Sequence, residues 1–163
     1  MVVVSDTSPL SNLAIIGRLE LLREQFGEVL MPPAVVGELT ALNSASARTV
    51  LSEAIQGGWL RQMPLASTAP FPEELRGLDA GEAEALRLAL TISANAVLMD
   101  EKEGRQCAAS LGIRTIGALG VLISAKQSGS VSSLRREIER LRRDAGFFVD
   151  KALETRVLVM VGE

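Results

Sequence analysis

Histidine is absent from this chain of 163 residues, and cysteine occurs only once, at Cys107. The lack of imidazole excludes Ser-His-Asp and Cys-His catalysis, and it excludes zinc sites with histidine ligands. A single cysteine allows no internal disulfide, which suits a reducing compartment, and its helix-like surroundings predict a buried structural thiol. Any polar chemistry must therefore come from carboxylates, hydroxyls, lysine or arginine. Sites made only of carboxylates favour hard ions such as Mg²⁺ or Mn²⁺.

Long apolar runs are lacking too, because no stretch approaches the roughly 20 residues that a membrane helix needs. Strand-like residues begin at Val2, so we expect no secretory signal, a cytoplasmic location and no membrane contact. The net charge is −3, so the chain lacks the overall excess of basic residues that is typical of nucleic-acid-binding proteins. With 47% hydrophobic and 23% charged residues, the composition predicts a globular fold, and the length predicts one domain over residues 1–163.

Apolar runs of strand type alternate with segments of helical periodicity through most of the chain. The predicted strands are 2–4, 28–31, 59–63 (at a sheet edge), 95–99 and 112–117. The predicted helices are 10–26 with a break at Gly17, 33–39, 46–56, 79–92, 101–111 and 119–126, and residues 64–78 form a surface loop. This order predicts an α/β protein, a three-layer α/β/α fold with a mostly parallel sheet of four or five strands.

The chain changes character after residue 130, and we predict that residues 131–163 form a C-terminal helical extension. Residues 135–143 carry five arginines and two glutamates. The arginines are Arg135, Arg136, Arg140, Arg142 and Arg143. One interpretation is a solvated helix face joined by ion pairs at i,i+4 spacing through Glu139. The other is a patch that binds RNA phosphates or an acidic protein segment.

Two acids each follow directly on an apolar strand. The predicted strand 2–4 is followed by Ser5 and then Asp6, and the predicted strand 95–99 is followed by Asp100. Parallel strands would place both carboxylates at the same edge of the sheet, where open α/β sheets bind ligands. The alternative is that each aspartate only caps the following helix; after Asp6, however, we expect Ser8 to be the N-cap and Pro9 the first helical residue.

Three glutamates are further candidates, each with a structural alternative. Glu82 fits a capping box with Asp79 as N-cap, although its helix start is free to approach the ligand edge. Glu38 lies in a helix whose neighbouring residues face the core, so it is either at the boundary or solvent-facing, and the pattern by itself favours a surface position. Glu103 follows Asp100 by about one helical turn, in a first turn that favours acids anyway.

Clustered carboxylates repel one another unless a divalent cation lies among them. Mg²⁺ accepts carboxylate oxygens, retains waters and binds substrate phosphate. It also lowers the pKa of a bound water and offsets charge on a phosphoryl group. A carboxylate cluster without histidine therefore points to phosphodiester chemistry.

Four short motifs together resemble the PIN domain family. They are Val-Val-Ser-Asp6-Thr7-Ser8, Val-Val-Gly-Glu38-Leu, Glu82 at 18 positions before Asp100, and Val-Leu-Met-Asp100. The resemblance covers about residues 1–130 and implies a three-layer α/β/α fold. Many members are VapC-like toxin ribonucleases of toxin–antitoxin pairs, and the C-terminal segment is similar to a less characterised PIN subgroup.

The resemblance implies a role for each matching residue. Asp6, Glu38, Glu82 and Asp100 match the four family acids in order, although the third is commonly aspartate. Asp6 and Asp100 would hold Mg²⁺ or Mn²⁺ directly, with Glu82 and Glu38 acting through waters or activating the attacking water. Supporting roles fall to Thr7 or Ser8, as the hydroxyl that orients the first acid, and to Glu103 as an extra acid. The implied activity is endonucleolytic cleavage of RNA, with an antitoxin protein as partner.

Two other functions stay open from the sequence. One is a phosphotransfer or phosphatase domain with an aspartate nucleophile, but the phosphatase type has a second aspartate where this chain has Ser8. The other is an interaction protein with little or no nuclease activity, motivated by the arginine-rich segment. The apolar residues 157–161 would then contact an antitoxin or a second copy in a homodimer, although intramolecular packing is their commoner fate.

Overall fold

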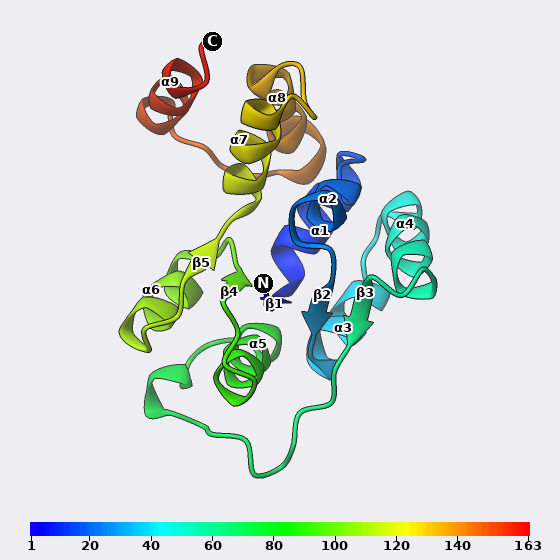
Figure 1. Ribbon diagram of the computed structural model, residues 1–163, viewed down its shortest axis with the longest axis vertical. Coiled ribbons are helices and arrows are strands. Elements are labelled where there is room, and N and C mark those ends of the chain that lie inside the picture. The colour runs from blue at the N-terminus through cyan, green and yellow to red at the C-terminus, as the bar shows by residue number, and fades with distance from the viewer.

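A computed structural model describes all 163 residues and has a sheet of five parallel strands at its centre (Figure 1). The strands are β1 (Val3–Ser5), β2 (Val29–Met31), β3 (Leu60–Gln62), β4 (Ala96–Leu98) and β5 (Thr115–Ile116). Their order across the sheet is β3-β2-β1-β4-β5, so the chain begins in the middle and extends to both sides. β1, β2 and β4 are buried along their whole length, as their unbroken apolar character predicts for parallel strands.

Nine α-helices and one 3-10 turn surround the sheet. They are α1 (Thr7–Ile15), α2 (Glu20–Phe26), α3 (Pro33–Thr40), α4 (Ala45–Gln56), η1 (Glu73–Leu75), α5 (Ala80–Thr91), α6 (Lys102–Ser110), α7 (Ala118–Ser128), α8 (Leu134–Ala145) and α9 (Lys151–Met160). The predicted three-layer α/β/α architecture is confirmed, and the predicted strands at the two sheet edges, β3 and β5, both exist. No helix has the length and apolar character needed to cross a membrane.

Each face of the sheet carries its own apolar core. Val3 and Leu98 point to the larger core, which is filled by α1, α2, α4 and α7 and reaches α8 and α9. Val4 and Val97 point to the smaller core beneath α5 and α6. This division follows from the alternation of side chains along a strand. Cys107 is buried in the smaller core, as predicted, and its thiol donates to the backbone oxygen of Glu74.

One predicted helix boundary is wrong. Helix α1 begins at Thr7 with Asp6 in the extended N-cap conformation, so Ser8 is already inside the helix and is not the cap. The Asp6 side chain accepts no capping hydrogen bond. The N-cap position is therefore filled by a residue whose carboxylate is free for another role.

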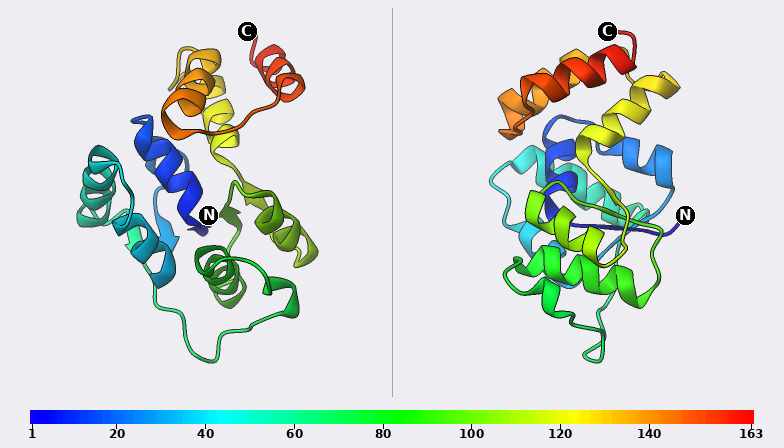
Figure 2. Two further views of the ribbon diagram at one scale, coloured as in Figure 1. Left: turned by 180° about the vertical axis from the view of Figure 1, so that it is seen from behind. Right: turned by 90° about the vertical axis from the view of Figure 1, so that its left-hand side faces the viewer.

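Residues 131–163 contain α8 and α9, which lie beyond α7 at the far end of the molecule from α5 (Figures 1 and 2). Leu134, Ile138 and Leu141 of α8 are fully buried in the larger core. The buried carboxylate of Glu137 accepts from Arg18, 2.7 Å away, and from Arg140 at 3.3 Å. This ion pair links α8 to the turn between α1 and α2. The division of the chain into a domain and an extension stays a prediction.

Glu163 connects the end of the C-terminal segment to the start of α8 through hydrogen bonds. Its carboxylate accepts from the backbone N–H groups of Leu134 (2.6 Å) and Arg135 (3.0 Å) and lies 3.2 Å from the Lys126 ammonium. Burial raises the pKa of Glu163, but these hydrogen bonds outweigh it and lower the pKa to about 2. A carboxylate at a helix N-terminus is also favoured by the helix dipole.

Glu163→Gln is expected to lower the free energy of unfolding at pH 7 by about 1 kcal/mol, because the variant loses the ionised acceptor. A pKa lowered by folding stabilises the protein above the ordinary glutamate value, and this contribution disappears as pH falls from about 4.5 to about 2. Urea unfolding at pH 7 and pH 3 should therefore show a smaller difference between the proteins at pH 3. Glu20→Gln, at an exposed pair with Arg23, is the control. Equal stabilities of wild type and Glu163→Gln at pH 7 would contradict the assignment.

Candidate active site

The carboxyl ends of β1 and β4 meet at the centre of one sheet edge. Ser5 pairs with Leu98, and the Asp6 N–H donates to the Leu98 oxygen at 2.9 Å. Asp6 and Asp100 therefore leave adjacent strands on the same side of the sheet, as the sequence predicts. The Asp6 side chain is only 2% exposed.

Glu38 reaches this edge from α3. Its carboxylate accepts from the Thr7 hydroxyl and, at 3.2 Å, from the Gly81 N–H, so α1, α3 and α5 are joined through one side chain. Glu38 is half-buried among polar partners, so it takes the boundary position and not a fully solvent-facing one. The resemblance implies that the Thr7 or Ser8 hydroxyl orients Asp6, but the Thr7 hydroxyl donates its hydrogen bond to Glu38.

Asp79 is the N-cap of α5. Its carboxylate accepts from the Glu82 N–H at 2.8 Å, and the Glu82 carboxylate accepts from the Asp79 N–H at 3.2 Å. The predicted capping box is thus confirmed. It gives Asp79 a fixed orientation, with its side chain exposed at the same edge as Asp6.

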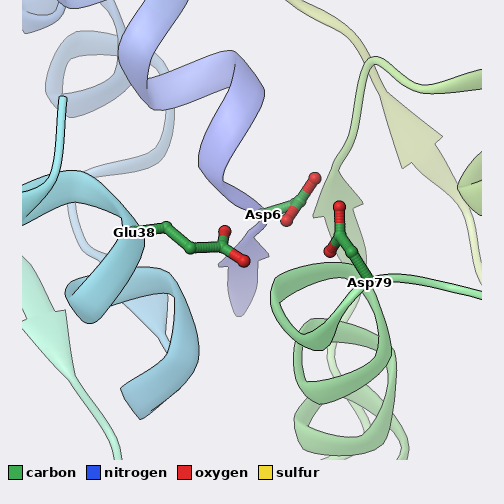
Figure 3. Close-up of side chains that lie close together, drawn as sticks. All are labelled: Asp6, Glu38 and Asp79. Atoms are coloured by element: carbon green, nitrogen blue, oxygen red, sulfur yellow. The ribbon is translucent and has the colours of Figure 1, made fainter. Parts of the chain in front are cut away.

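Asp6, Glu38 and Asp79 form an acid cluster whose carboxylates converge on one space (Figure 3). One oxygen from each residue lies within 4.8 Å of the other two. The Asp6 Oδ1 atom is buried and has no hydrogen-bond partner. A buried carboxylate oxygen without a donor is costly, and a cation among the three acids would remove that cost.

The electrostatics of the acid cluster match this geometry. Burial raises the pKa of Asp6 to about 7, against a smaller lowering by the Thr7 N–H, and the negative charges of Asp79, Glu82 and Glu38 raise it further. The pKa of Glu82 is also raised, first by burial and then by Asp79. Burial and the neighbouring negative charges thus both disfavour the ionised forms of Asp6 and Glu82.

Asp100 lies outside the acid cluster. Its Oδ2 accepts from Asn12 on α1 at 2.9 Å, and its Oδ1 accepts from the Ala118 N–H at 2.7 Å. Burial raises its pKa, opposed by these two hydrogen bonds and by the charge of Arg105. Both oxygens therefore have donors, in contrast to Asp6.

Comparison with known proteins gives one result for the whole chain. A protein-family model described as a PIN domain matches residues 2–163. This chain belongs to the PIN domain family. No curated protein matches it. PIN domains have a nuclease-type fold and typically use divalent ions, and the acid cluster of this chain lies where the strands of such a fold end.

Two other predicted site residues of this PIN domain, Glu103 and Ser8, are not members of the acid cluster. Glu103 is exposed on α6 and raises the pKa of Glu82 through its charge. Ser8 donates to Glu101 at 3.4 Å, not to Asp6. Asp79 was missed by sequence reasoning, because its role as N-cap already accounted for it. The one sequence feature that could have indicated it is Gly81, two residues after Asp79. The lack of a side chain at Gly81 lets the Glu38 carboxylate approach the start of α5.

The arginine-rich segment of this PIN domain is largely paired within the chain. Arg140 pairs with Glu137, Arg142 with Glu154, and Arg143 with Asp144. The pairs expected at i,i+4 spacing through Glu139 do not form; acids at other positions take their place. Arg135 and Arg136 are exposed and form no ion pair with a side chain.

Gly81→Ala is expected to weaken Mn²⁺ binding about tenfold. A Cβ atom at Gly81 would overlap the Glu38 carboxylate and lie 2.9 Å from its carbon, so Glu38 must swing out of the acid cluster. The fold should not suffer, because alanine favours helix over glycine by up to about 1 kcal/mol. Gly37→Ala is the matched control, since a Cβ at that helical glycine meets nothing within 4 Å. Mn²⁺ titration calorimetry measures the effect, and equal affinities in both variants would argue against a role for Glu38.

Proposed function

We propose that this PIN domain is a metal-dependent endoribonuclease that hydrolyses RNA phosphodiester bonds at the acid cluster. The observation that carries the proposal is the unpartnered, buried Asp6 Oδ1 atom within reach of two further carboxylates. The donor set is all oxygen and contains no sulfur or imidazole, which suits Mg²⁺ or Mn²⁺. Family membership supports a nucleic-acid substrate.

Asp6, Glu38 and Asp79 would hold the ion. When bound, the ion supplies positive charge that lowers the pKa of an attacking water and offsets charge on the phosphoryl group. Glu38 is held in place by Thr7 and Gly81, so its carboxylate is already oriented. Asp79 Oδ1 accepts the capping hydrogen bond from the Glu82 N–H, so the Asp79 carboxylate is oriented as well. The water oxygen would bond to phosphorus as a phosphorus–oxygen bond of the RNA chain breaks. The attacking water would lose a proton to bulk solvent, and the leaving oxygen would take one from bulk solvent.

Asp100 and Glu82 have supporting roles in this proposal. Asp100 joins Asn12 of α1 to the start of α7, and α1 is the helix that begins directly after Asp6. Its metal-binding role is then indirect, through the position of Asp6. Glu82 orients Asp79 through the capping box and adds negative charge beside the ion.

The finer biological assignment is that this nuclease is the toxin of a cytoplasmic toxin–antitoxin pair. Its support is the motif resemblance to VapC-like PIN domains. An antitoxin or a second copy would have an apolar contact in Val159 and Met160, which are 72% and 56% exposed on α9. Co-expression with the product of an adjacent gene, followed by a growth assay with and without it, tests this assignment. Growth unaffected by the chain alone would count against a toxin.

The experiment for the activity itself is an RNA cleavage assay with pooled transcripts, with and without Mg²⁺ or Mn²⁺. Wild type should cut only with the metal present, and Asp144→Asn, at an exposed surface pair, should cut equally well. Cleavage that persists in excess chelator would contradict the proposed role of the metal.

A further inference from the structure

A groove of about 690 Å³ lies between β5, α7 and the segment that leads from α8 to α9. That segment passes α7 before α9 begins (Figures 1 and 2), and its residues Phe147, Phe148 and Val149 line the groove. The apolar part of the lining includes Ile116, Leu119, Ile123, Phe147, Leu153 and Val157. The volume is in the range of pockets that hold ligands of nucleotide size.

The polar part of the groove includes Asp100, whose strand β4 is the neighbour of the strand that Asp6 follows. Two arginines, Arg105 and Arg114, line the same groove, and neither forms an ion pair. Arg105 is fixed by donating to the Met99 oxygen at 2.9 Å. Arg114 is therefore available to an anionic ligand in the groove, and Arg105 adds positive charge beside Asp100.

Aromatic side chains concentrate in this groove. The chain has only four phenylalanines, one tryptophan and no tyrosine, and three of the phenylalanines line the groove: Phe26, Phe147 and Phe148. Phe148 is 85% exposed, so its ring contributes little to folding. Cations beside exposed aromatic rings are the combination that binds single-stranded nucleic acid, through phosphate contacts and base stacking.

We propose that this groove binds the single-stranded RNA that flanks the scissile phosphate, with Arg105 and Arg114 at backbone phosphates and Phe148 stacked on a base. The inference rests on the proposed function, because the scissile phosphate is the one that would be cleaved at the acid cluster. RNA is favoured over an acidic peptide because the exposed Phe148 lines the same groove as the two arginines. A nucleic acid uses both, through base stacking and phosphate contacts, whereas an acidic peptide would use only the arginines.

The test measures RNA binding without cleavage. The full chain carries Asp6→Asn, and a fluorescein-labelled ten-nucleotide oligouridine is titrated in the presence of EDTA. Adding Arg114→Ala and Phe148→Ala together should weaken binding at least tenfold and lower its salt dependence. The matched control is Arg76→Ala with Phe71→Ala, an arginine and a phenylalanine that are exposed outside the groove.

A second readout isolates stacking. Phe148→Trp should lose fluorescence when oligouridine is added, and Phe71→Trp should not. Unchanged oligouridine affinity in the groove variant, or an unquenched Phe148→Trp, overturns the inference. So does displacement of the RNA by a glutamate-rich peptide that binds more tightly.

The two proposals fail separately. If the wild type does not cut RNA yet the groove variants lose RNA binding, the nuclease proposal falls and the groove stands. If the wild type cuts RNA and the groove variants bind and cut equally well, the groove inference alone is overturned.

Discussion

Asp6→Asn is expected to reduce metal-dependent RNA cleavage by about 10³-fold or more while the protein stays folded. The variant removes one charged ligand at the centre of the acid cluster, and the ion contributes several kcal/mol of charge stabilisation, at about 1.4 kcal/mol per tenfold in rate. Asparagine has nearly the same shape and is an equally good N-cap, so α1 should begin unchanged. Initial cleavage rates and circular dichroism spectra of both proteins measure the two effects.

The same variant should be more stable than wild type in metal-free buffer at pH 8. Folding raises the pKa of Asp6 from 3.8 to about 7, so the folded wild type loses stability as pH rises through that range. The loss is of order a few kcal/mol, because one pKa unit corresponds to about 1.4 kcal/mol. The amide carries no charge and escapes the loss. An Asp6→Asn variant that is less stable than wild type at pH 8 would contradict the view that burial destabilises the Asp6 charge.

Asp79→Asn is expected to lower both Mn²⁺ affinity and cleavage by about 100-fold. The structure places Asp79 in the acid cluster, and asparagine keeps its capping hydrogen bond from the Glu82 N–H while losing the charge. Asp150→Asn is the matched control, because Asp150 caps α9 in the same way, with a hydrogen bond from the Leu153 N–H, but belongs to no cluster.

Glu82→Gln decides between the two acids at the start of α5. Glutamine retains the hydrogen bond to the Asp79 N–H, so the capping box stays closed. We expect less than a tenfold loss of Mn²⁺ affinity, because the Glu82 carboxylate lies beside the acid cluster and acts only through its charge. A Glu82→Gln variant more damaged than Asp79→Asn would return the third ligand to the position suggested by the family motif.

The sequence predicts the sheet and one edge of the site well because both depend on local pattern. Unbroken apolar runs mark β1 and β4 as buried parallel strands, and the geometry of parallel strands then brings Asp6 and Asp100 to one edge. The contacts of Asp100 do not follow from pattern. Asn12 lies on a helix at a distant point of the chain, and the N–H of Ala118 carries no side-chain signal.

Glu38 and Asp79 show where sequence reasoning fails in two different ways. Glu38 sits among core-facing neighbours, so its pattern favours solvent; only the packing of α3 against α5 gives it partners. The N-cap position of Asp79 accounts for this residue locally, so the capping pattern does not indicate that its carboxylate also lies in the acid cluster. Ser8 failed as N-cap because Asp6, one residue after β1, already takes the extended conformation that begins α1.

Mn²⁺ titration calorimetry on the wild type and Asp6→Asn tests the central claim most directly. The account predicts saturable binding of one Mn²⁺ by wild type at pH 7.5, loss of that binding in Asp6→Asn, and full binding in Asp150→Asn. Equal binding by wild type and Asp6→Asn, or no saturable binding by wild type, would contradict it.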